Sequence, residues 1–239
     1  MVKKYHLYLY SKEKKYYEYC KSIRACGIIY TAGTSREHFG LDHTSSIPLV
    51  LLDRKSFADL PSYSIHSNND EALKLLVNYL YHLNHRTIGY IGGVRGSLSG
   101  QQRYAAYQKY MAELGLQVKD DHILFDSFSE ESGMKAFDHF TSLPSPPTAI
   151  IAASDQIARG FIMRANSLGS SIPDDFSICG IDGVDMQFYP KITSVKQDVE
   201  KLARYTFDFI VHANENPPPA KRVLNVSLSL GQTCRKLKL

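Results

Sequence analysis

Short apolar runs alternate with longer amphipathic stretches along almost the whole chain. The clearest example is PTAIIAASDQIARG at residues 147–160, where an unbroken apolar run ends at Ser154 and Asp155 and small, helix-compatible residues follow. An unbroken apolar run is typical of a strand that is buried on both faces of a parallel sheet. The pattern therefore predicts a strand, a tight turn and the start of a helix.

Further apolar runs predict strands, and stretches with apolar residues at helical spacing predict the helices between them. Besides the strand within 147–153, we expect strands at residues 5–10, 26–30, 47–54, 87–93, 121–125, 176–181 and 223–230. We expect helices at residues 13–24, 70–83, 103–114, 129–143, 156–168 and 198–213, the last of them after a loop through Pro190. The run at 223–230 alternates apolar and polar residues, as an exposed or edge strand does.

Strands that alternate with helices predict an α/β fold with doubly wound parallel sheets and right-handed crossovers. About eight or nine strands are more than one small sheet needs, so we expect two such lobes with a ligand cleft between them. The N-terminal lobe should comprise residues 1–66 and 199–222, and the C-terminal lobe residues 67–198 and 223–239. Both lobes are therefore expected to be discontinuous in sequence.

The composition favours a soluble globular protein and constrains the function only loosely. Of the 239 residues, 44% are hydrophobic and 22% are charged, as in ordinary globular domains. The net charge of +4 arises without a Lys/Arg block long enough for a nucleic-acid arm. No window is apolar enough for a membrane span or a signal peptide, so we expect a cytoplasmic protein with no membrane partner.

The four cysteines stand at positions 20, 26, 179 and 234, with neither a CxxC motif nor any paired metal-ligand spacing. Cys26 and Cys179 lie in apolar runs, as buried small hydrophobic residues do. We therefore expect all four cysteines to be reduced and structural. The sequence predicts no metal site and no cofactor.

Ser154 and Asp155 follow the end of a predicted buried strand. In open α/β sheets, ligands bind beyond the carboxyl ends of the strands, so these two side chains are candidates for holding a small polar molecule. The alternative is that they cap the following helix, a role worth about 1 kcal/mol. The residues by themselves leave both interpretations open.

Several stretches occur in an order that resembles the effector-binding domain of lactose-repressor-type (LacI/GalR) bacterial transcription regulators. Besides residues 147–160 they are IPLVLLDR at 47–54, NHRTIGYIGG at 84–93, QRYAAY at 102–107, SG at 132–133, PDDFSICGID at 173–182 and PKITSVKQD at 190–198. The resemblance implies a type I periplasmic-binding-protein-like fold, in which the cleft between two lobes holds a small-molecule effector. That effector would be a sugar or, alternatively, a nucleobase, and the protein would be a homodimer.

The resemblance also implies ligand contacts for individual residues. Asp53 and Asp182 match acidic residues that accept hydrogen bonds from ligand hydroxyls. Arg103 matches a cleft arginine whose guanidinium can donate to two vicinal oxygens. Phe128 falls where the family often places an aromatic ring against the apolar face of a sugar.

Four further positions complete this set of ligand-binding candidates. Ser154 stands where Asn is commoner, with Asp155 beside it, Gln197 matches a polar contact on the hinge side, and Thr31 ends its expected strand. Three of the eight residues also have structural alternatives. Arg103 could be an exposed cation at a helix start, Asp182 a turn residue before a glycine, and Phe128 a core aromatic.

The chain departs from the family pattern at its start. Nothing before Tyr5 could hold the family's helix-turn-helix and hinge helix, so DNA would be bound only through a domain that this chain lacks. The family also has one more strand and helix before residues 5–29. Either the chain is a truncated product, or residues 5–10 take the central place in a reduced first lobe.

Three function classes are compatible with such a fold. The first is the effector-binding and dimerisation domain of a LacI-type regulator, in which ligand-driven lobe closure controls DNA binding. The second is an extracytoplasmic sugar-binding protein of a transport system, which would need a signal peptide or a lipoprotein cysteine. The third is an enzyme, for which we find no activated nucleophile, phosphate-binding loop or metal spacing.

Overall fold

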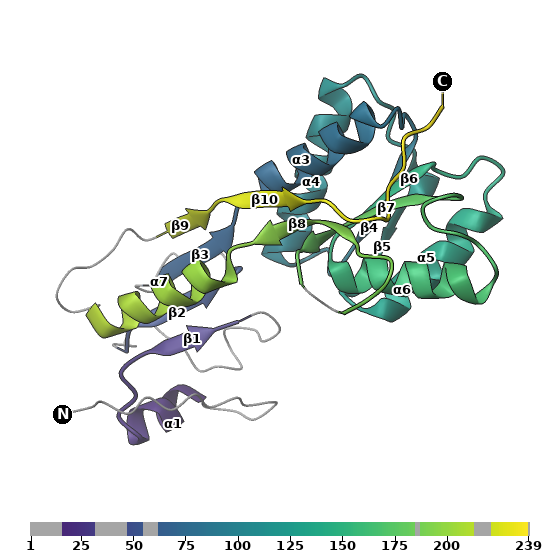
Figure 1. Ribbon diagram of the computed structural model, residues 1–239. Coiled ribbons are helices and arrows are strands. Elements are labelled where there is room, and N and C mark those ends of the chain that lie inside the picture. The colour runs from purple at the N-terminus through teal and green to yellow at the C-terminus, as the bar shows by residue number, and fades with distance from the viewer. Residues whose placement is uncertain (1–15, 32–46, 55–61, 185–186, 213–220, 239) are drawn as a thin grey trace. The chain divides into compact units, whose positions relative to one another are not determined.

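The computed structural model describes residues 16–31, 47–54, 62–184, 187–212 and 221–238 (Figure 1). The chain divides into two compact units, Met1–Ile65 with Ala203–Arg222, and His66–Leu202 with Val223–Leu239. The sheets of the described residues have four and six strands, and we call the two units the four-stranded unit and the six-stranded unit. The strand expected at residues 5–10, with its central place, lies outside the described residues.

The four-stranded sheet has the strand order β1-β2-β3-β9. Its strands are β1 (Ile28–Tyr30), β2 (Leu49–Leu52), β3 (Tyr63–Ser67) and β9 (Lys221–Leu224), and β1, β2 and β3 pair in parallel. A small core forms where helix α1 (Tyr16–Ser22) contributes Tyr17 beside buried residues of the first two strands. Helix α7 (Val199–His212) adds Phe209, whose ring stacks on Tyr63 with the ring centroids 4.6 Å apart.

The six-stranded sheet has the strand order β10-β8-β7-β6-β4-β5. Its strands are β4 (Ile88–Gly92), β5 (Ile123–Phe125), β6 (Ala149–Ala152), β7 (Ser177–Asp182), β8 (Thr193–Gln197) and β10 (Val226–Ser229). All neighbours pair in parallel except β10, which runs antiparallel to β8. Because the strands are joined through helices on both faces, this unit confirms the expected doubly wound α/β fold.

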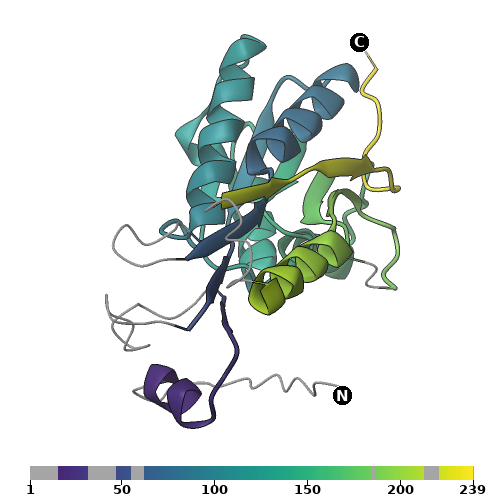
Figure 2. The same cartoon turned by 90° about the vertical axis from the view of Figure 1, so that its left-hand side faces the viewer.

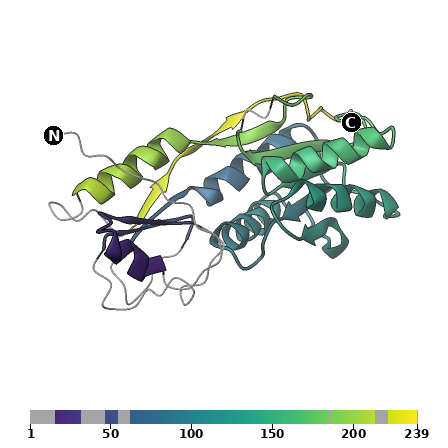
Figure 3. The same cartoon turned by 90° about the horizontal axis from the view of Figure 1, so that it is seen from below.

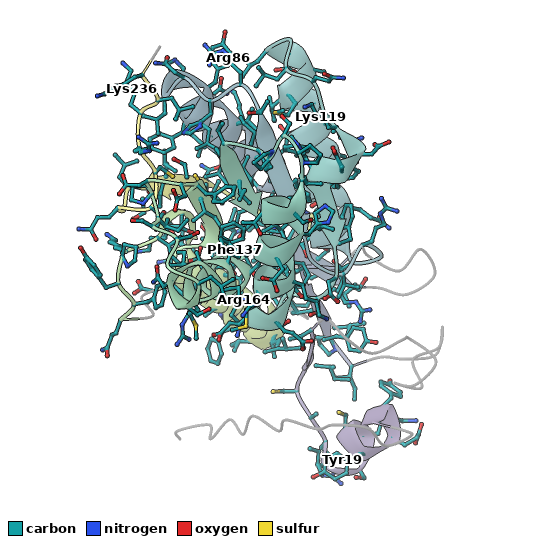
Figure 4. All side chains as sticks on the ribbon, turned by 90° about the vertical axis from the view of Figure 1, so that its right-hand side faces the viewer. Tyr19, Arg86, Lys119, Phe137, Arg164 and Lys236 are labelled. Carbon is teal, nitrogen blue, oxygen red and sulfur yellow. The ribbon has the colours of Figure 1, made fainter. Side chains whose placement is uncertain are left out.

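Two pairs of helices cover this sheet. Helices α3 (Asn69–His82) and α4 (Leu98–Glu113) lie side by side on one face (Figure 2). Helices α5 (Glu130–Ser142) and α6 (Asp155–Ser167) lie side by side on the other (Figure 3). A short 3-10 helix, η1 (Asp120–His122), precedes β5. The core between α5 and α6 is aromatic. The Phe137 ring (Figure 4) packs edge to face on the Phe161 ring, with the ring centroids 5.2 Å apart.

Two strands were missed by the sequence prediction. All five residues of β3 are buried although Ser64, His66 and Ser67 are polar, so the segment has no apolar run. Strand β8 lies in what was expected to be a loop after Pro190, because its apolar content is a single Val195. Buried polar side chains are stable here because they are hydrogen-bonded; Ser64 Oγ, for example, donates to the Arg54 carbonyl oxygen at 2.5 Å.

Element boundaries also differ from expectation, most clearly at two places. The single strand expected at residues 223–230 is two strands, β9 and β10, each at an edge of a different sheet. Helix α4 begins at Leu98 rather than at 103, because Ser97 caps it by accepting a hydrogen bond from the Gly100 N–H at 3.0 Å. This earlier start places Arg103 inside the helix. In the described residues, no helix combines the length and the apolar character that a membrane span requires.

Candidate functional site

Polar side chains gather at the carboxyl edge of the six-stranded sheet. Strand β7 ends at Asp182 and β8 at Gln197, and β6 is followed by Ser154 and Asp155. The carboxyl ends of parallel strands share one edge, so these four predicted site residues lie along the same edge of one sheet. Figure 1 shows β6, β7 and β8 as neighbours in that sheet.

Arg103 is buried beside this edge, with 4% of its surface exposed. Its Nε donates to Asn69 Oδ1 at 2.8 Å, and its Nη1 donates to the backbone carbonyl of Ala153. Its Nη2 lies 3.9 Å from Asp182 Oδ1. A buried cation needs partners of this kind, since an unpaired one would be very costly. The structure thus excludes the alternative that Arg103 is an exposed cation at a helix start.

The Asp182 side chain is more open than that of Arg103, with 32% of its surface exposed. Its Oδ1 accepts a hydrogen bond from Gln197 Nε2 at 2.6 Å, and Gln197 Oε1 accepts one from Ser67 Oγ at 2.7 Å. Burial raises the pKa of Asp182 to about 6, although the positive charge of Arg103 opposes that rise. A carboxylate with room at its surface and a raised pKa can exchange hydrogen bonds with an incoming polar group.

Both carboxylate oxygens of Asp155 accept hydrogen bonds from the protein itself. Its Oδ1 accepts a hydrogen bond from Ser194 Oγ at 2.6 Å, and its Oδ2 accepts one from the Val184 N–H at 2.9 Å. Burial raises the pKa of Asp155, and these hydrogen bonds oppose the rise. A Cβ added at Gly180 would collide with Asp155 Oδ1, so β7 approaches this carboxylate as closely as only glycine allows. Asp155 therefore holds α6 against β7 and β8.

Ser154 acts as the N-cap of α6. Its Oγ accepts a hydrogen bond from the Ile157 N–H at 3.2 Å, and the residue is 4% exposed. The capping interpretation of this serine is thus what the structure shows. A ligand contact by Ser154 or Asp155 stays a prediction.

Phe128 follows β5 and is half-buried. Its ring lies against Gly93, where an added Cβ would collide with the ring carbons. The same ring packs on the main core of the six-stranded unit. Phe128 is therefore at least partly a core aromatic, which was the structural alternative for this residue. Its contact with a sugar ring stays a prediction.

Asp53 and Thr31 belong to the four-stranded unit. Asp53 follows β2 with φ of 51°, and its backbone N–H donates to the Ile65 carbonyl at 3.0 Å. Thr31 follows β1 and is exposed, and its carbonyl oxygen accepts a hydrogen bond from Arg54 at 3.3 Å. Both residues lie at the carboxyl ends of neighbouring parallel strands. Their convergence with Arg103 and Asp182 on one ligand stays a prediction.

Sequence reasoning missed several partners in this network. Asn69, at the start of α3, accepts from Arg103 and donates through Nδ2 to Gln102 Oε1 at 2.8 Å. Ser67 and Ser194 bind Gln197 and Asp155 as described above. Asn69 comes shortly after β3, so recognising that strand would have marked it as a strand-end polar residue.

The six-stranded unit also has a hollow of about 370 Å³, next to Asp155. Lys191, Lys196 and Ser194 are among the residues that line it, and Asp155 is the one predicted site residue among them. This hollow is therefore distinct from the Arg103–Asp182 pair. Among the residues that the structure describes, no cluster of three or more His, Cys, Asp or Glu side chains could hold a metal ion.

A doubly wound unit with charged and amide side chains at the carboxyl edge of its sheet is typical of α/β domains that bind small molecules. Residues 77–234 match the family of that description, the periplasmic binding protein-like domain, and the chain belongs to this family.

Two curated relatives are transcriptional repressors. The chain is 27% identical over 238 residues to the HTH-type transcriptional repressor PurR of Vibrio campbellii, which covers 96% of this chain and 70% of that protein. It is 30% identical over 204 residues to the probable HTH-type transcriptional repressor ExuR of Bacillus subtilis, which covers 83% of this chain and 61% of that protein. These relatives confirm the resemblance to LacI-type regulators.

Solved structures share the fold. A transcription regulator from Lactobacillus plantarum superposes with a TM-score of 0.82 at 26% identity, covering 93% of this chain and 87% of that one. A LacI family transcriptional regulator from Enterococcus faecium, solved with bound ribose, superposes with a TM-score of 0.81 at 21% identity, covering 93% and 84%.

Proposed function

We propose that this chain is the effector-binding domain of a LacI-type transcription regulator and that Arg103 and Asp182 contact the effector. The observation that carries the proposal is the buried guanidinium of Arg103, 3.9 Å from a carboxylate that keeps 32% of its surface exposed. A fixed donor beside a partly open acceptor can hold a molecule whose neighbouring oxygens accept from the guanidinium and whose hydroxyls donate to the carboxylate.

A sugar is the effector class that this chemistry suits best. Carboxylates of Asp182 and Asp53 would accept from hydroxyls, Arg103 would donate to vicinal oxygens, and Phe128 would cover the C–H face of the ring. The remaining candidates, Ser154, Asp155, Gln197 and Thr31, would add polar contacts. Ribose, which is bound in the Enterococcus faecium regulator, has such hydroxyls on neighbouring carbons and a C–H face. A nucleobase is the alternative.

Regulation would follow from unequal contacts in two states. An effector that binds one arrangement of the lobes better than another shifts the equilibrium between them, and a dimeric regulator transmits the shift to its DNA-binding heads. In this proposal the chain is a cytoplasmic homodimer without catalytic activity, and it reaches DNA through a helix-turn-helix domain of the kind named in its relatives. The transport-protein alternative is not favoured, because the relatives are transcriptional repressors.

Thermal unfolding with a panel of pentoses, hexoses, disaccharides and purines tests this proposal. A ligand at roughly 100 times its Kd stabilises the protein by about 2.7 kcal/mol, so the correct class should raise the Tm by several degrees. The Arg103→Lys variant keeps the charge but loses the planar fork, and should bind the same ligand at least about tenfold more weakly.

The matched control is Arg164→Lys, since Arg164 pairs with Asp138 at 2.8 Å on the exposed face of α6. It should leave the Kd unchanged. If no member of the panel shifts the Tm, or if both lysine variants bind equally well, the site assignment is wrong.

A further inference from the structure

Two of the four cysteines meet in the six-stranded unit. Cys179 lies on β7 and Cys234 lies in the segment that follows β10, and their Sγ atoms are 3.3 Å apart. Both are free thiols. They are 55 positions apart in sequence, so their spacing gave no sign of this contact.

The backbone on both sides of Cys234 is tied to the start of β7. The Ile178 N–H donates to the Thr233 carbonyl at 2.8 Å, and Thr233 Oγ1 donates to the Ile178 carbonyl at 2.6 Å. The Arg235 N–H donates to Ser177 Oγ at 3.0 Å. The two cysteines are thus held opposite each other. A disulfide bond is about 2.05 Å long, so closing it requires the sulfurs to approach by roughly 1.3 Å.

The two thiols differ in access and in acidity. Cys179 has 0% of its surface exposed, and burial raises the pKa of its thiol. Cys234 is half-buried, and hydrogen bonds with Cys179, Thr193 and Thr233 lower the pKa of its thiol. The thiolate is the reactive form of cysteine, so Cys234 is the thiol that a small oxidant in solution would reach first.

We propose that Cys179 and Cys234 form a peroxide-sensitive dithiol pair that closes to a disulfide. The Cys234 thiolate attacks one oxygen of a hydroperoxide, the O–O bond breaks, and the leaving oxygen takes up a proton to become an alcohol or water. The Cys179 sulfur then attacks the resulting sulfenic sulfur and loses its proton, and hydroxide leaves as water. Two thiols lose two electrons, and the hydroperoxide gains them.

The new bond would fasten the C-terminal segment to a strand that also carries a candidate site residue. Asp182 lies three positions after Cys179 on β7. The same C-terminal segment contacts the region before β4, where the Arg235 carbonyl lies 3.1 Å from His85 Nε2 and the Leu237 N–H donates to the Leu83 carbonyl at 2.9 Å. Oxidation would therefore stiffen the amino-terminal edge of the sheet. The pair does not depend on the effector site for its chemistry.

A Cys20→Ser/Cys26→Ser variant tests the proposal without touching the pair, because both of these cysteines belong to the four-stranded unit. After brief treatment with a few equivalents of hydrogen peroxide, both remaining thiols should resist alkylation, and the intact mass should fall by about 2 Da as two hydrogens are lost. Peptide mapping should find positions 179 and 234 linked, and dithiothreitol should restore both thiols. The Tm should rise by roughly 5–10 °C, because the crosslink closes a long loop.

Two matched variants sharpen the test. Cys234→Ala, added to the same background, should show neither the mass loss nor the Tm rise, and Cys179→Ala should leave Cys234 as a sulfenic acid that a dimedone-type reagent traps. If both thiols of the parent variant stay open to alkylation after peroxide, the proposal is overturned. It is also overturned if Cys234 is oxidised to the sulfinic acid with no link to Cys179.

Discussion

The start of α6 and the end of β7 each place a carboxylate at the same edge of the six-stranded sheet, in different surroundings. Asp155 is 2% exposed, and both of its oxygens accept hydrogen bonds from the protein. Asp182 is 32% exposed, and its Oδ1 accepts a hydrogen bond from Gln197 and lies near Arg103. A carboxylate whose oxygens are both occupied contributes to the fold, whereas one with open surface can bind a ligand. Position at a strand end does not distinguish these roles.

The Asp155→Ala change should produce the largest effect on stability. It leaves the buried Ser194 Oγ without its acceptor, at a cost of about 1–3 kcal/mol, and removes the hydrogen bond from the exposed Val184, worth about 1 kcal/mol, so we expect a total loss of roughly 2–4 kcal/mol. Urea denaturation measures the free energy of unfolding. Asp138→Ala, which removes an exposed partner of Arg164, is the control and should cost less than about 1 kcal/mol. Equal losses in the two variants would contradict the structural role of Asp155.

The Gly180→Ala change disturbs the surroundings of Asp155 from the side of β7. The new Cβ would collide with Asp155 Oδ1, which Ser194 holds in place, so the free energy of unfolding should fall by about 1–3 kcal/mol. Gly96→Ala serves as the control, because no atom of the described residues lies within 4 Å of its added Cβ. A Gly180→Ala protein as stable as the control would show that Asp155 can move aside.

The Ser154→Ala change separates capping from ligand binding. It removes the acceptor of the Ile157 N–H and should cost about 1 kcal/mol of stability. If the serine only caps α6, effector affinity measured by calorimetry should stay the same once the protein is folded. A more than tenfold loss of affinity, without a matching loss of stability, would instead assign Ser154 to the ligand.

The Asp182→Asn change should have the smallest effect on stability at low pH, where Asp182 is itself neutral, and a clear effect on the pH dependence of stability. The folded-state pKa of Asp182 is raised to about 6, so ionising this group in the folded protein opposes folding. This destabilisation is present above about pH 6 and is relieved as the pH falls towards the unfolded-state pKa, near 4. Urea denaturation of the wild type and the Asp182→Asn variant across this range should show that the substitution removes this contribution.

The same Asp182→Asn variant should bind the effector at least about tenfold more weakly, because an amide is a weaker acceptor than a carboxylate. Asp126→Asn, which changes an exposed residue paired with Lys135 at 3.2 Å, is the control for both measurements. An Asp182→Asn protein with unchanged affinity would remove Asp182 from the site.

The sequence predicted those elements whose hydrophobic pattern is unmistakable. The apolar run before Ser154 became β6, and the amphipathic stretches became α3, α5 and α6 within a residue or two. Strands β3 and β8 escaped because polar side chains occupy buried positions in them. Thr193, for example, is 0% exposed, and its N–H donates to Thr233 Oγ1 at 3.0 Å. A hydrophobicity pattern does not register a polar residue that distant partners satisfy.

The sequence predicts one of the strand ends that carry site residues and not the others. Asp182 follows an apolar run that predicts β7, whereas Gln197 is a candidate only through the family resemblance, because neither its strand β8 nor β3, which Asn69 follows, has an apolar run. The contact between Cys179 and Cys234 depends on a return of the chain over 55 positions, which local spacing does not encode. Contacts between residues so far apart in sequence depend on the topology of the fold, so the two cysteines can be recognised as a pair only in the folded structure.

The orientation of the Arg103 side chain depends on the main chain, because Nη1 of its guanidinium donates a hydrogen bond to the Ala153 carbonyl, just past β6. The location of this positive charge is therefore set by the backbone as well as by the Asn69 side chain, whose Oδ1 accepts from Nε. Under the proposed function, substitutions at neighbouring positions would change which effector binds while the guanidinium keeps its place. One fold could in this way bind different small molecules.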